Sequence, residues 1–336
     1  MIDSNQALKT FFDEIKNSSW IALDTEFVRV NTYYPKFCLL QIATETQAKC
    51  IDILAITDIS LFDFLYQKNL IWVVHSARQD IEVLFNLTNK LPYQLFDTQI
   101  AASFLKFDRQ VAYKTLVQEY CNIELQKGYA RFDWSIRPLP NEVLKYALDD
   151  VIYLAKIYPM IKNKLIEKNF LSWVEEDNKK LLDKKLYENN PLDSWKKVKI
   201  PNIKIPELVF ERLCYFALAR EIKAQQKNKP RLWIKKDKEI LENAFNLNKD
   251  TEIILKLKKE YPILRNIKQP ICKNKPLNKI QKQYKKELQK QIEIKASEYN
   301  LPIENFLTNK QLNSFVQGNI KNLTTGWRAK ILKEIK

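Results

Sequence analysis

The segment Trp20-Ile21-Ala22-Leu23-Asp24-Thr25-Glu26-Phe27-Val28 is an apolar, β-rich run that carries two acids one residue apart. Its apolar flanks predict a buried strand. Side chains alternate between the faces of a strand, so Asp24 and Glu26 point to the same side, about 7 Å apart. Two carboxylates on one face of a core strand repel each other unless a cation lies between them. A solvated edge strand with ordinary surface acids is the alternative interpretation.

A third acid, Asp80, follows a second apolar run. Residues Leu70–Val74 predict another core strand, which leads through His75–Arg78 into a helix that begins near Gln79. Asp80 then lies in the first helical turn, where acids are common because they complement the helix dipole. Asp80 alone therefore does not indicate a functional site. It is a candidate metal ligand only together with the other acids.

The last acid of the set, Asp150, comes four residues after Tyr146. Both lie in the run 141–154, which has helical periodicity and Asn141 as its expected N-cap. The spacing i, i+4 puts Tyr146 and Asp150 on one helix face, whereas Asp149 points about 100° away. An acidic cluster of this composition can hold two divalent metal ions against a phosphodiester.

Six segments of the first half resemble, in the same order, the exonuclease domain of ribonuclease D. They are LDTEFVRVNTYYPKFCLLQIA (23–43), VVHSARQDIEVLF (73–85), FDTQIAASFL (96–105), QVAYKTLV (110–117), RFDWSIRPLP (131–140) and YALDDVIYL (146–154). That family belongs to the DEDD superfamily of 3′→5′ exonucleases, in the branch with tyrosine in its third motif. The resemblance implies a ribonuclease-H-like α/β fold, in which a mixed sheet is flanked by helices. One motif alone would be weak evidence, whereas six in order are strong evidence.

The resemblance also implies the roles of the site residues. The implied ligands of two divalent ions, Mg²⁺ or Mn²⁺, are Asp24, Glu26, Asp80 and Asp150, and Tyr146 is the implied water-positioning residue. Because a free tyrosine has a pKa near 10, we expect Tyr146 to orient the water rather than accept its proton at pH 7.

Four further residues are candidates for substrate contacts. His75 is the only histidine, and a sister branch of the superfamily uses histidine as its base. Here Tyr146 fills that position, so we expect His75 at a strand end that lines the substrate channel. Phe27 and Gln41 are candidate channel residues as well, although such side chains in strands more often pack in the core. Arg131 is a candidate phosphate contact.

The chain departs from the family pattern in its glycines. Family members carry glycines before the segment QVAY, where this chain has Lys106–Arg109 and then Ala112. It has only three glycines, Gly128, Gly318 and Gly326. Turns near the substrate channel must therefore be made by other residues.

The second half is much more basic than the first. Residues 1–165 hold 18 basic and 19 acidic side chains, and the remaining 171 residues hold 38 basic and 21 acidic ones. Essentially the whole net charge of +16 therefore lies in the second half. Neutralising phosphates requires a basic region of this size. A genome that prefers lysine on solvated surfaces is the alternative, and it explains only part of the difference.

Periodicity predicts helices in this half. A helix over Leu208–Glu221, a loop over Asn228–Ile234 and a second helix near Asp237 resemble the HRDC domain, a small helical bundle that binds nucleic acid. A weaker resemblance to a second such domain runs from Tyr284 to the end. Trp233 and Trp327 are candidates for RNA contacts or for core packing. The expected domains are an exonuclease domain (1–168), a linker (169–206), an HRDC-like domain (207–275) and a second, divergent HRDC-like domain (280–336).

The expected function is that of a metal-dependent 3′→5′ exoribonuclease that releases nucleoside 5′-monophosphates. The resemblance implies tRNA precursors and other small structured RNAs as substrates. One alternative is a DNA exonuclease, because the acids do not distinguish the sugars. Another is a non-catalytic RNA-binding protein that kept the fold, although such a protein has no need of all four acids and Tyr146. We expect a monomer.

Other classes of protein are disfavoured by composition. No apolar run reaches membrane-spanning length and no signal pattern opens the chain, so we expect a cytoplasmic protein without membrane contact. The five cysteines are scattered without C-x-x-C spacing, which indicates neither a disulfide framework nor a zinc site. No phosphate-binding glycine loop is present, which argues against NTP-driven chemistry.

Overall fold

The computed structural model describes residues 1–125, 128–129, 131–201, 205–246, 252–269, 276–319 and 324–333. The chain divides into two compact units: residues 1–28, 37–187 and 277–336 form the first, and residues 29–36 and 188–276 the second. Each unit has a hydrophobic core of its own. No helix among the described residues is both long and apolar enough to cross a bilayer.

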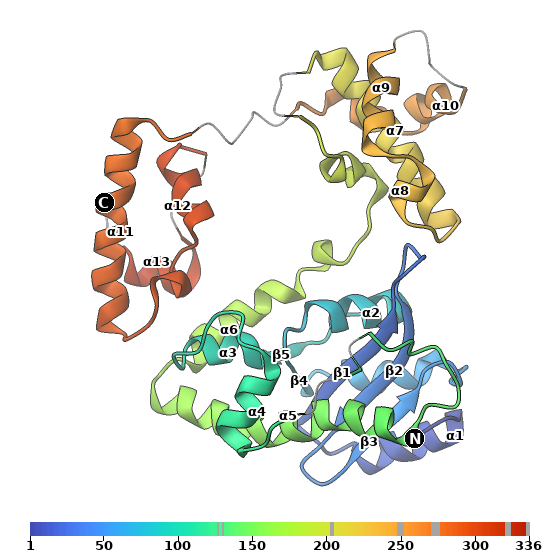
Figure 1. The fold of residues 1–336 in the computed structure, drawn as a ribbon, viewed down its shortest axis with the longest axis vertical. Helices are drawn as coiled ribbons and strands as arrows, with labels where there is room; N and C mark the ends of the chain where they lie inside the picture. The colour runs from blue at the N-terminus through green and yellow to red at the C-terminus, as the bar shows by residue number, and fades with distance from the viewer. Residues whose placement is uncertain are drawn as a thin grey trace. The chain divides into compact units, whose positions relative to one another are not determined.

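The first unit is built on a five-stranded mixed sheet with the strand order β3-β2-β1-β4-β5 (Figure 1). The strands are β1 (Trp20–Val28), β2 (Lys36–Ala43), β3 (Ala48–Asp52), β4 (Ile71–Val74) and β5 (Gln94–Asp97). The pairs β1–β4 and β4–β5 are parallel, and β2–β3 is antiparallel. β1 lies at the centre, so helices can cover both of its faces and its apolar run is buried, as predicted.

Helices cover both faces of this sheet. On one face, Ile21 and Leu23 of β1 pack in a core shared with α1 and α2. On the other face, Ala22 and Val73 pack in the core to which α3, α4, α5 and α6 contribute. These helices are α1 (Asn5–Glu14), α2 (Arg78–Thr88), α3 (Thr98–Ser103), α4 (Tyr113–Cys121), α5 (Asn141–Glu167) and α6 (Leu171–Lys179). Since Asp24 follows Ala22 by two residues, it lies on the face that α5 covers.

Non-glycine residues make the turns where the family pattern has glycine. Lys106, between α3 and α4, adopts a left-handed backbone conformation with φ of 72°. Five asparagines in the described chain also have positive φ, and asparagine tolerates this region better than other non-glycine residues. The chain thus keeps its tight turns with three glycines.

The stretch 169–206, expected to be a linker, is structured and contributes to both units. Val174 on α6 is fully buried in the core of the first unit. Trp195 lies in a 3₁₀ helix, Pro191–Lys197, and packs edge-on against Phe210 in the second unit. The burial of single apolar side chains in an otherwise polar stretch cannot be predicted from its composition. Residues 202–204 lie outside the described chain.

The second unit is helical, in agreement with the sequence, and begins at residue 188, earlier than expected. Its helices are α7 (Glu207–Gln226), α8 (Arg231–Ile234), α9 (Asp237–Phe245) and α10 (Glu252–Glu260). The core centres on α7, where Leu213 and Tyr215 are fully buried. Residues 29–36 belong to this unit, in which Asn228 Oδ1 accepts the N–H of Tyr33 at 3.0 Å. Residues 247–251 and 270–275 of the expected domain lie outside the described chain.

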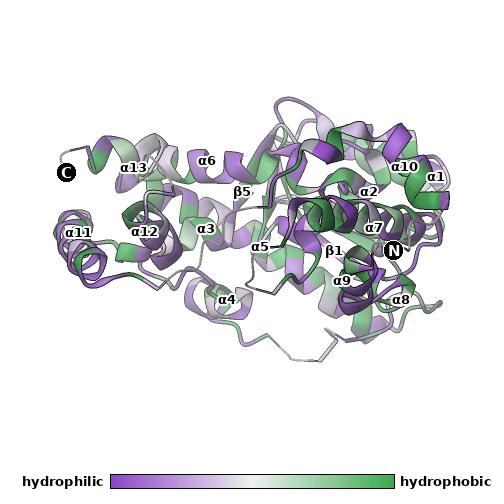
Figure 2. Ribbon diagram, turned by 90° about the horizontal axis from the view of Figure 1, so that it is seen from above, coloured by the Kyte–Doolittle hydropathy of each residue, from purple (hydrophilic) through white to green (hydrophobic). Residues whose placement is uncertain are grey.

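The C-terminal helices share the core of the first unit and do not form the separate domain expected for 280–336. They are α11 (Lys279–Glu298), α12 (Asn309–Val316) and α13 (Gly326–Ile331). Figure 2 shows α11 as largely hydrophilic, and the few apolar residues that it buries include Leu288 and Ile292. A thin apolar stripe on a lysine-rich helix is enough to dock it when the partner surface is apolar.

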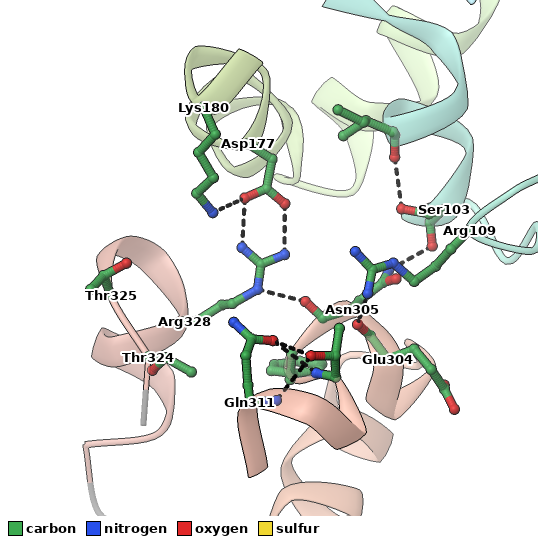
Figure 3. A pocket seen from close by; sticks show the side chains of 13 residues that line it. Ser103, Arg109, Asp177, Lys180, Glu304, Asn305, Gln311, Thr324, Thr325 and Arg328 are labelled. Atoms are coloured by element: carbon green, nitrogen blue, oxygen red, sulfur yellow. Dashed lines mark hydrogen bonds and ion pairs between the residues drawn. The ribbon is translucent and has the colours of Figure 1, made fainter. Parts of the chain in front are cut away.

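Contacts between α13 and α6 hold these C-terminal helices in place. The guanidinium of Arg328 donates to both carboxylate oxygens of Asp177 at 2.5 and 2.7 Å, beside a cavity of about 410 Å³ (Figure 3). The Trp327 ring stacks on Trp173 with a centroid distance of 4.3 Å, and only 3% of Trp327 is exposed. Trp327 is therefore a core residue, which excludes it as an RNA contact.

The glycine before Trp327 provides a test of this docking. Gly326 has φ of 65°, and a Cβ built there would overlap the Glu176 carboxylate, which accepts the N–H of Trp327 at 2.9 Å. In Gly326→Ala, the alanine should be strained at this positive φ, and its Cβ should break the hydrogen bond. Together these effects should lower the free energy of unfolding by about 2–4 kcal/mol. Gly318→Ala is the matched control, because Gly318 has φ of 71° with nothing within 4 Å of its Cβ. Urea denaturation should show a loss of only about 1 kcal/mol for it, and equal losses in the two variants would refute the proposed contact.

Candidate active site

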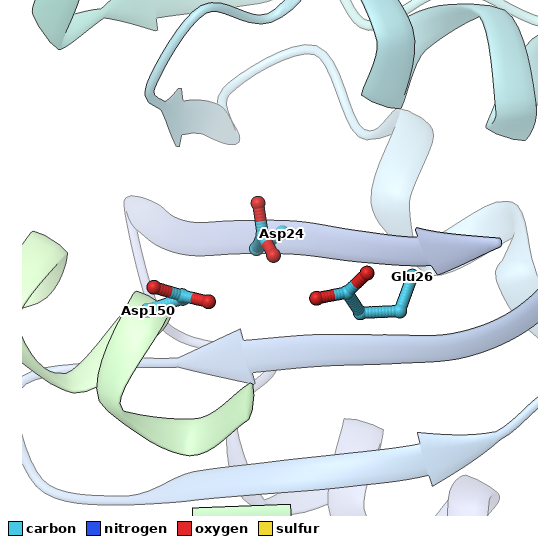
Figure 4. A group of neighbouring side chains, drawn as sticks. All are labelled: Asp24, Glu26 and Asp150. Atoms are coloured by element: carbon cyan, nitrogen blue, oxygen red, sulfur yellow. The ribbon is translucent and has the colours of Figure 1, made fainter. Parts of the chain in front are cut away.

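Three of the predicted acids meet at one place on the sheet. Asp24 and Glu26 come from β1 and Asp150 from α5, and one oxygen of each carboxylate lies within 4.8 Å of the other two. Figure 4 shows the three side chains turned toward a common space between the strand and the helix. Strand alternation and the packing of α5 against β1 produce this arrangement. We call these three residues the acid trio.

Asp80 stands apart from the acid trio. It lies in the first turn of α2, as predicted, and is only 6% exposed. Its Oδ1 accepts a hydrogen bond from the Thr25 hydroxyl at 2.7 Å. Asp80 lines the same cleft as the trio. Three of the four acids thus bring their carboxylates together at one point, and the fourth, Asp80, lies beside them in the same cleft.

Burial raises the pKa values of all four acids, and the charges of neighbouring carboxylates raise them further. Burial, followed by the charges of Asp24, Asp150 and Asp80, raises the pKa of Glu26 to about 9. Burial, followed by the charges of Asp149 and Asp80, raises the pKa of Asp150 to about 7. For both Asp24 and Asp80 the pKa lies well above its usual value, first because of burial and then because of the neighbouring carboxylates.

In the part of the chain that the structure describes, no basic side chain pairs with this cluster. Among the described residues, no lysine, arginine or histidine forms an ion pair with any of the four acids. An all-oxygen donor set suits hard divalent cations such as Mg²⁺. Binding such cations would relieve the repulsion that raises the four pKa values. The residues present therefore fit a divalent metal site.

Tyr146 lies beside the trio on the same face of α5. Its ring packs against Tyr129 and Trp134, with centroid distances of 5.5 and 6.4 Å. Burial raises the pKa of Tyr146 first, and the charges of Asp150, Glu26 and Asp24 raise it further. The phenol is thus neutral at pH 7. Its hydroxyl can donate or accept a hydrogen bond, but it cannot take up a proton as a phenolate could. This agrees with the expectation that Tyr146 orients a water molecule.

The cleft around these residues measures about 530 Å³. Two of the four predicted substrate contacts line it, namely Phe27 and His75. Gln41 does not: it is fully buried in β2, where helices cover the central strands. Arg131 is exposed and lies outside the residues that line the cleft.

His75 is held by hydrogen bonds on both ring nitrogens. Nδ1 lies 3.0 Å from the Thr98 hydroxyl and Nε2 lies 3.0 Å from the Val111 carbonyl oxygen. Burial lowers the pKa of His75, against the charge of Asp97 and the bond to Val111, which raise it. The ring is thus fixed in position at the cleft and has no free nitrogen with which to act as a base.

Tyr113, a residue that no sequence pattern singled out, also lines the cleft. Its hydroxyl donates to the Asp149 carbonyl at 3.2 Å, and its ring lies 5.5 Å from that of His75. Burial and then the charges of Asp150 and Asp24 raise its pKa. The segment QVAYKTLV contains this tyrosine, but no spacing rule links it to the acids, because the fold alone brings α4 to α5.

Comparisons with known proteins identify the family of this chain. Residues 1–166 match the family described as 3'-5' exonuclease. The ribonuclease D of Zymomonas mobilis is 38% identical over 249 residues, which cover 73% of this chain and 63% of that protein. The ribonuclease D of Sphingobium indicum is also 38% identical, over 247 residues that cover 73% of this chain and 63% of that protein. The chain belongs to the ribonuclease D family of DEDD 3′→5′ exonucleases.

The match covers less than two thirds of the length of these ribonuclease D relatives. Among solved structures, Escherichia coli RNase D, described as an exoribonuclease involved in structured RNA processing, has a TM-score of 0.82 and 24% identity. The likeness covers 99% of this chain and 96% of that one, and it shows that the two share their fold. The predicted fold class, a mixed sheet with helices followed by a helical C-terminal region, is confirmed.

The raised pKa of Glu26 predicts how the metal-free protein responds to pH. Above about pH 4.5 the unfolded chain loses a proton that folded Glu26 keeps until about pH 9, so the fold loses stability as pH rises between these values. Glu26→Gln removes this loss. At pH 8 in chelator, it should raise the thermal midpoint by about 2–4 °C, as about 1 kcal/mol does in a domain of this size.

Glu45→Gln serves as the control for this measurement, because Glu45 is exposed in the β2–β3 hairpin. Its midpoint should follow the wild type at every pH. A thermal midpoint for Glu26→Gln below that of the wild type at pH 8 would mean that burial and the neighbouring carboxylates do not destabilise the ionised Glu26 side chain in the folded protein.

Proposed function

We propose that this chain is a metal-dependent 3′→5′ exoribonuclease that releases nucleoside 5′-monophosphates. The observation that carries the proposal is the acid trio, in which three carboxylates share one position without a basic partner in the described chain. Family membership supports the reaction class. The ribonuclease D relatives support RNA as the substrate.

In this proposal, Asp24, Glu26 and Asp150 would hold one divalent ion, and Asp80, which lines the same cleft, would help Asp24 to hold a second one. When bound, Mg²⁺ or Mn²⁺ supplies a water molecule of lowered pKa and stabilises negative charge on the leaving 3′-oxygen. Thr25 orients the Asp80 carboxylate through its hydrogen bond. The positive charge of the metal ions would therefore balance the negative charge of the four carboxylates.

The other cleft residues position the reactants. Tyr146 holds the attacking water through its neutral hydroxyl. Phe27, Phe132 and Trp134 give the cleft an aromatic wall against which a terminal nucleotide can pack. His75, after the end of β4, and Tyr113, on α4, line the same cleft with their ring centroids 5.5 Å apart. Structured RNA with a single-stranded 3′ end, such as a tRNA precursor, is the substrate class that we infer.

A cytoplasmic site of action is also part of the proposal. The four cysteines in the described chain, Cys38, Cys50, Cys121 and Cys214, are all free thiols. Free thiols fit a reducing compartment, in which structural disulfides are rare. Cys272 lies outside the described residues.

Digestion of a 3′-extended tRNA with Mg²⁺ or Mn²⁺ tests the reaction. The wild type should remove nucleotides one at a time from the 3′ end. Asp24→Asn should slow this at least about 10³-fold, because several kcal/mol of charge stabilisation is lost with the metal site. Asp13→Asn, on the exposed side of α1, should leave the rate unchanged. Products are resolved nucleotide by nucleotide on a gel.

Matched RNA and DNA oligonucleotides decide between the alternatives. Equal or faster digestion of DNA would make the chain a DNA exonuclease. RNA binding without digestion by the wild type, together with no Mn²⁺ binding in calorimetry, would indicate a binding protein that kept the fold.

Tyr146→Phe separates water positioning from metal binding. The substitution removes only the hydroxyl, so kcat should fall about 10²-fold while Mn²⁺ affinity in calorimetry stays the same. Tyr93→Phe is the control, because Tyr93 is 58% exposed and is not among the residues that line the cleft. If Tyr146→Phe retains the wild-type kcat, the hydroxyl does not position the water.

A further inference from the structure

The segment between β1 and β2 is anchored among the helices of the second unit. Residues 29–36 lead from the end of β1 into β2, yet they belong to the second unit. Val30, near the start of this segment, is 73% exposed, whereas Tyr33 in its middle is only 7% exposed. We call residues 29–36 the β1–β2 strap. Connecting segments usually lie on the surface and are mobile, so the burial of Tyr33 indicates a specific anchor.

A fully buried carboxylate holds the tyrosine of the strap. Glu221, on α7, is 0% exposed, and its Oε1 accepts a hydrogen bond from the Tyr33 hydroxyl. The same carboxylate lies 3.6 Å from Lys197 Nζ and 3.2 Å from Arg231 Nε. Gln225 Nε2 donates to the Tyr33 oxygen at 3.2 Å. A buried charge is costly unless it is paired and hydrogen-bonded, so this network favours one geometry of the strap.

The backbone of the strap is held as well. Asn228, which follows α7, accepts the N–H groups of Tyr33 and Tyr34 on its Oδ1 at 3.0 and 3.1 Å. Asn228 itself has φ of 46°, in the left-handed region that asparagine tolerates. The strap is thus fixed through one side chain and through two backbone groups, so both its tyrosine and its path are determined by contacts with the end of α7.

The strap begins three residues after Glu26 of the acid trio. The register of β1 with β4 covers residues 20–22, so the end of β1 that carries Glu26 extends beyond this partner strand. Strand ends open easily unless other contacts hold them. Consecutive Cα atoms are about 3.8 Å apart, which leaves only a short tether between Glu26 and the anchored strap.

We propose that Tyr33, Glu221 and Asn228 are positioning residues for the acid trio. By anchoring the strap, they restrict the end of β1 and hold the Glu26 carboxylate where it meets the other two acids. The mutual repulsion of the three carboxylates favours their separation, and the anchor opposes it. The inference rests on the proposed function in one respect: it takes the acid trio as a metal site.

Amide hydrogen exchange in the metal-free protein tests the anchor. Asn228→Gly removes the oxygen that accepts two N–H groups of the strap, and glycine keeps the left-handed conformation. Exchange at residues 26–28 of the full chain, followed by mass spectrometry, should become roughly 10-fold faster, because two hydrogen bonds that oppose opening are lost. Asn228→Asp should restore the wild-type rate, because aspartate supplies an acceptor oxygen and tolerates this conformation.

Asn300→Gly is the matched control for this measurement. Asn300 is an exposed residue of the first unit that follows α11, and its φ of 55° is left-handed like that of Asn228. The substitution therefore makes the same change of residue type and backbone freedom away from the strap. Exchange at residues 26–28 should stay at the wild-type rate.

Metal affinity and turnover provide a second measurement. Mn²⁺ affinity, measured by calorimetry, should fall about 10-fold in Asn228→Gly and recover in Asn228→Asp, as it does for residues that orient a metal ligand. The kcat for RNA digestion should fall as well, whereas KM should not change, because Asn228 is not among the residues that line the cleft. A merely structural role would lower the thermal midpoint and leave Mn²⁺ affinity unchanged.

Two results would overturn the proposal. One is unchanged exchange at residues 26–28 in Asn228→Gly, and the other is an equal increase in Asn300→Gly. If Asn228→Gly fails to fold, Tyr33→Phe replaces it and should speed the same exchange, since it removes only the hydroxyl that donates to Glu221. A wild type that does not digest RNA would refute the exonuclease function alone. The exchange at the end of β1 would still decide about the strap, because it is measured without metal or substrate.

Discussion

Repulsion among buried carboxylates is the constraint on which the rest of this structure depends. The acid trio brings three carboxyl groups within 4.8 Å of one another on the covered face of a central strand. In water these groups would separate, so packing must hold them together. The core beneath α5, where Val151 and Leu154 are buried against the sheet, provides that packing. The trio is therefore a locally destabilised site in a well-packed domain, and it suits a cation because no basic side chain among the described residues forms an ion pair with it.

The acids were predictable because local geometry places them. The alternation of β1 and the i, i+4 spacing on α5 each need only a few consecutive residues, and both predictions agree with the structure. The hydrogen bond from Thr25 to Asp80 joins residues 55 positions apart, so no local rule could reveal it. Gln41 illustrates the same limit: its place in β2 could be predicted, whereas its complete burial depends on how the helices cover the sheet. The boundaries of the linker and of the last domain were not predictable, since they depend on contacts between distant segments.

The two tryptophans of the second half show how much such contacts decide. Trp233 and Trp327 both follow loops and both stand beside basic residues in the sequence, which gave them equal standing as RNA contacts. The structure separates them: Trp327 stacks on Trp173, and its N–H binds the Glu176 carboxylate, whereas Trp233 keeps 63% of its surface exposed. Residues of α6, in the stretch expected to be a linker and more than 150 positions away, thus determine that Trp327 is buried. Whether a tryptophan is buried depends on the surface that packs against it, and the residue type alone does not determine this.

The division of charge along the chain follows from the same chemistry. A lysine or arginine beside the acid trio would form ion pairs with it, lower its pKa values and compete with divalent cations for its oxygens. Binding of RNA, as proposed, requires cations for the phosphates. Residues 1–165 are near neutrality, with 18 basic and 19 acidic side chains, and the excess of lysine lies in the remaining residues. The charge division along the chain is therefore compatible with both requirements of the proposed function.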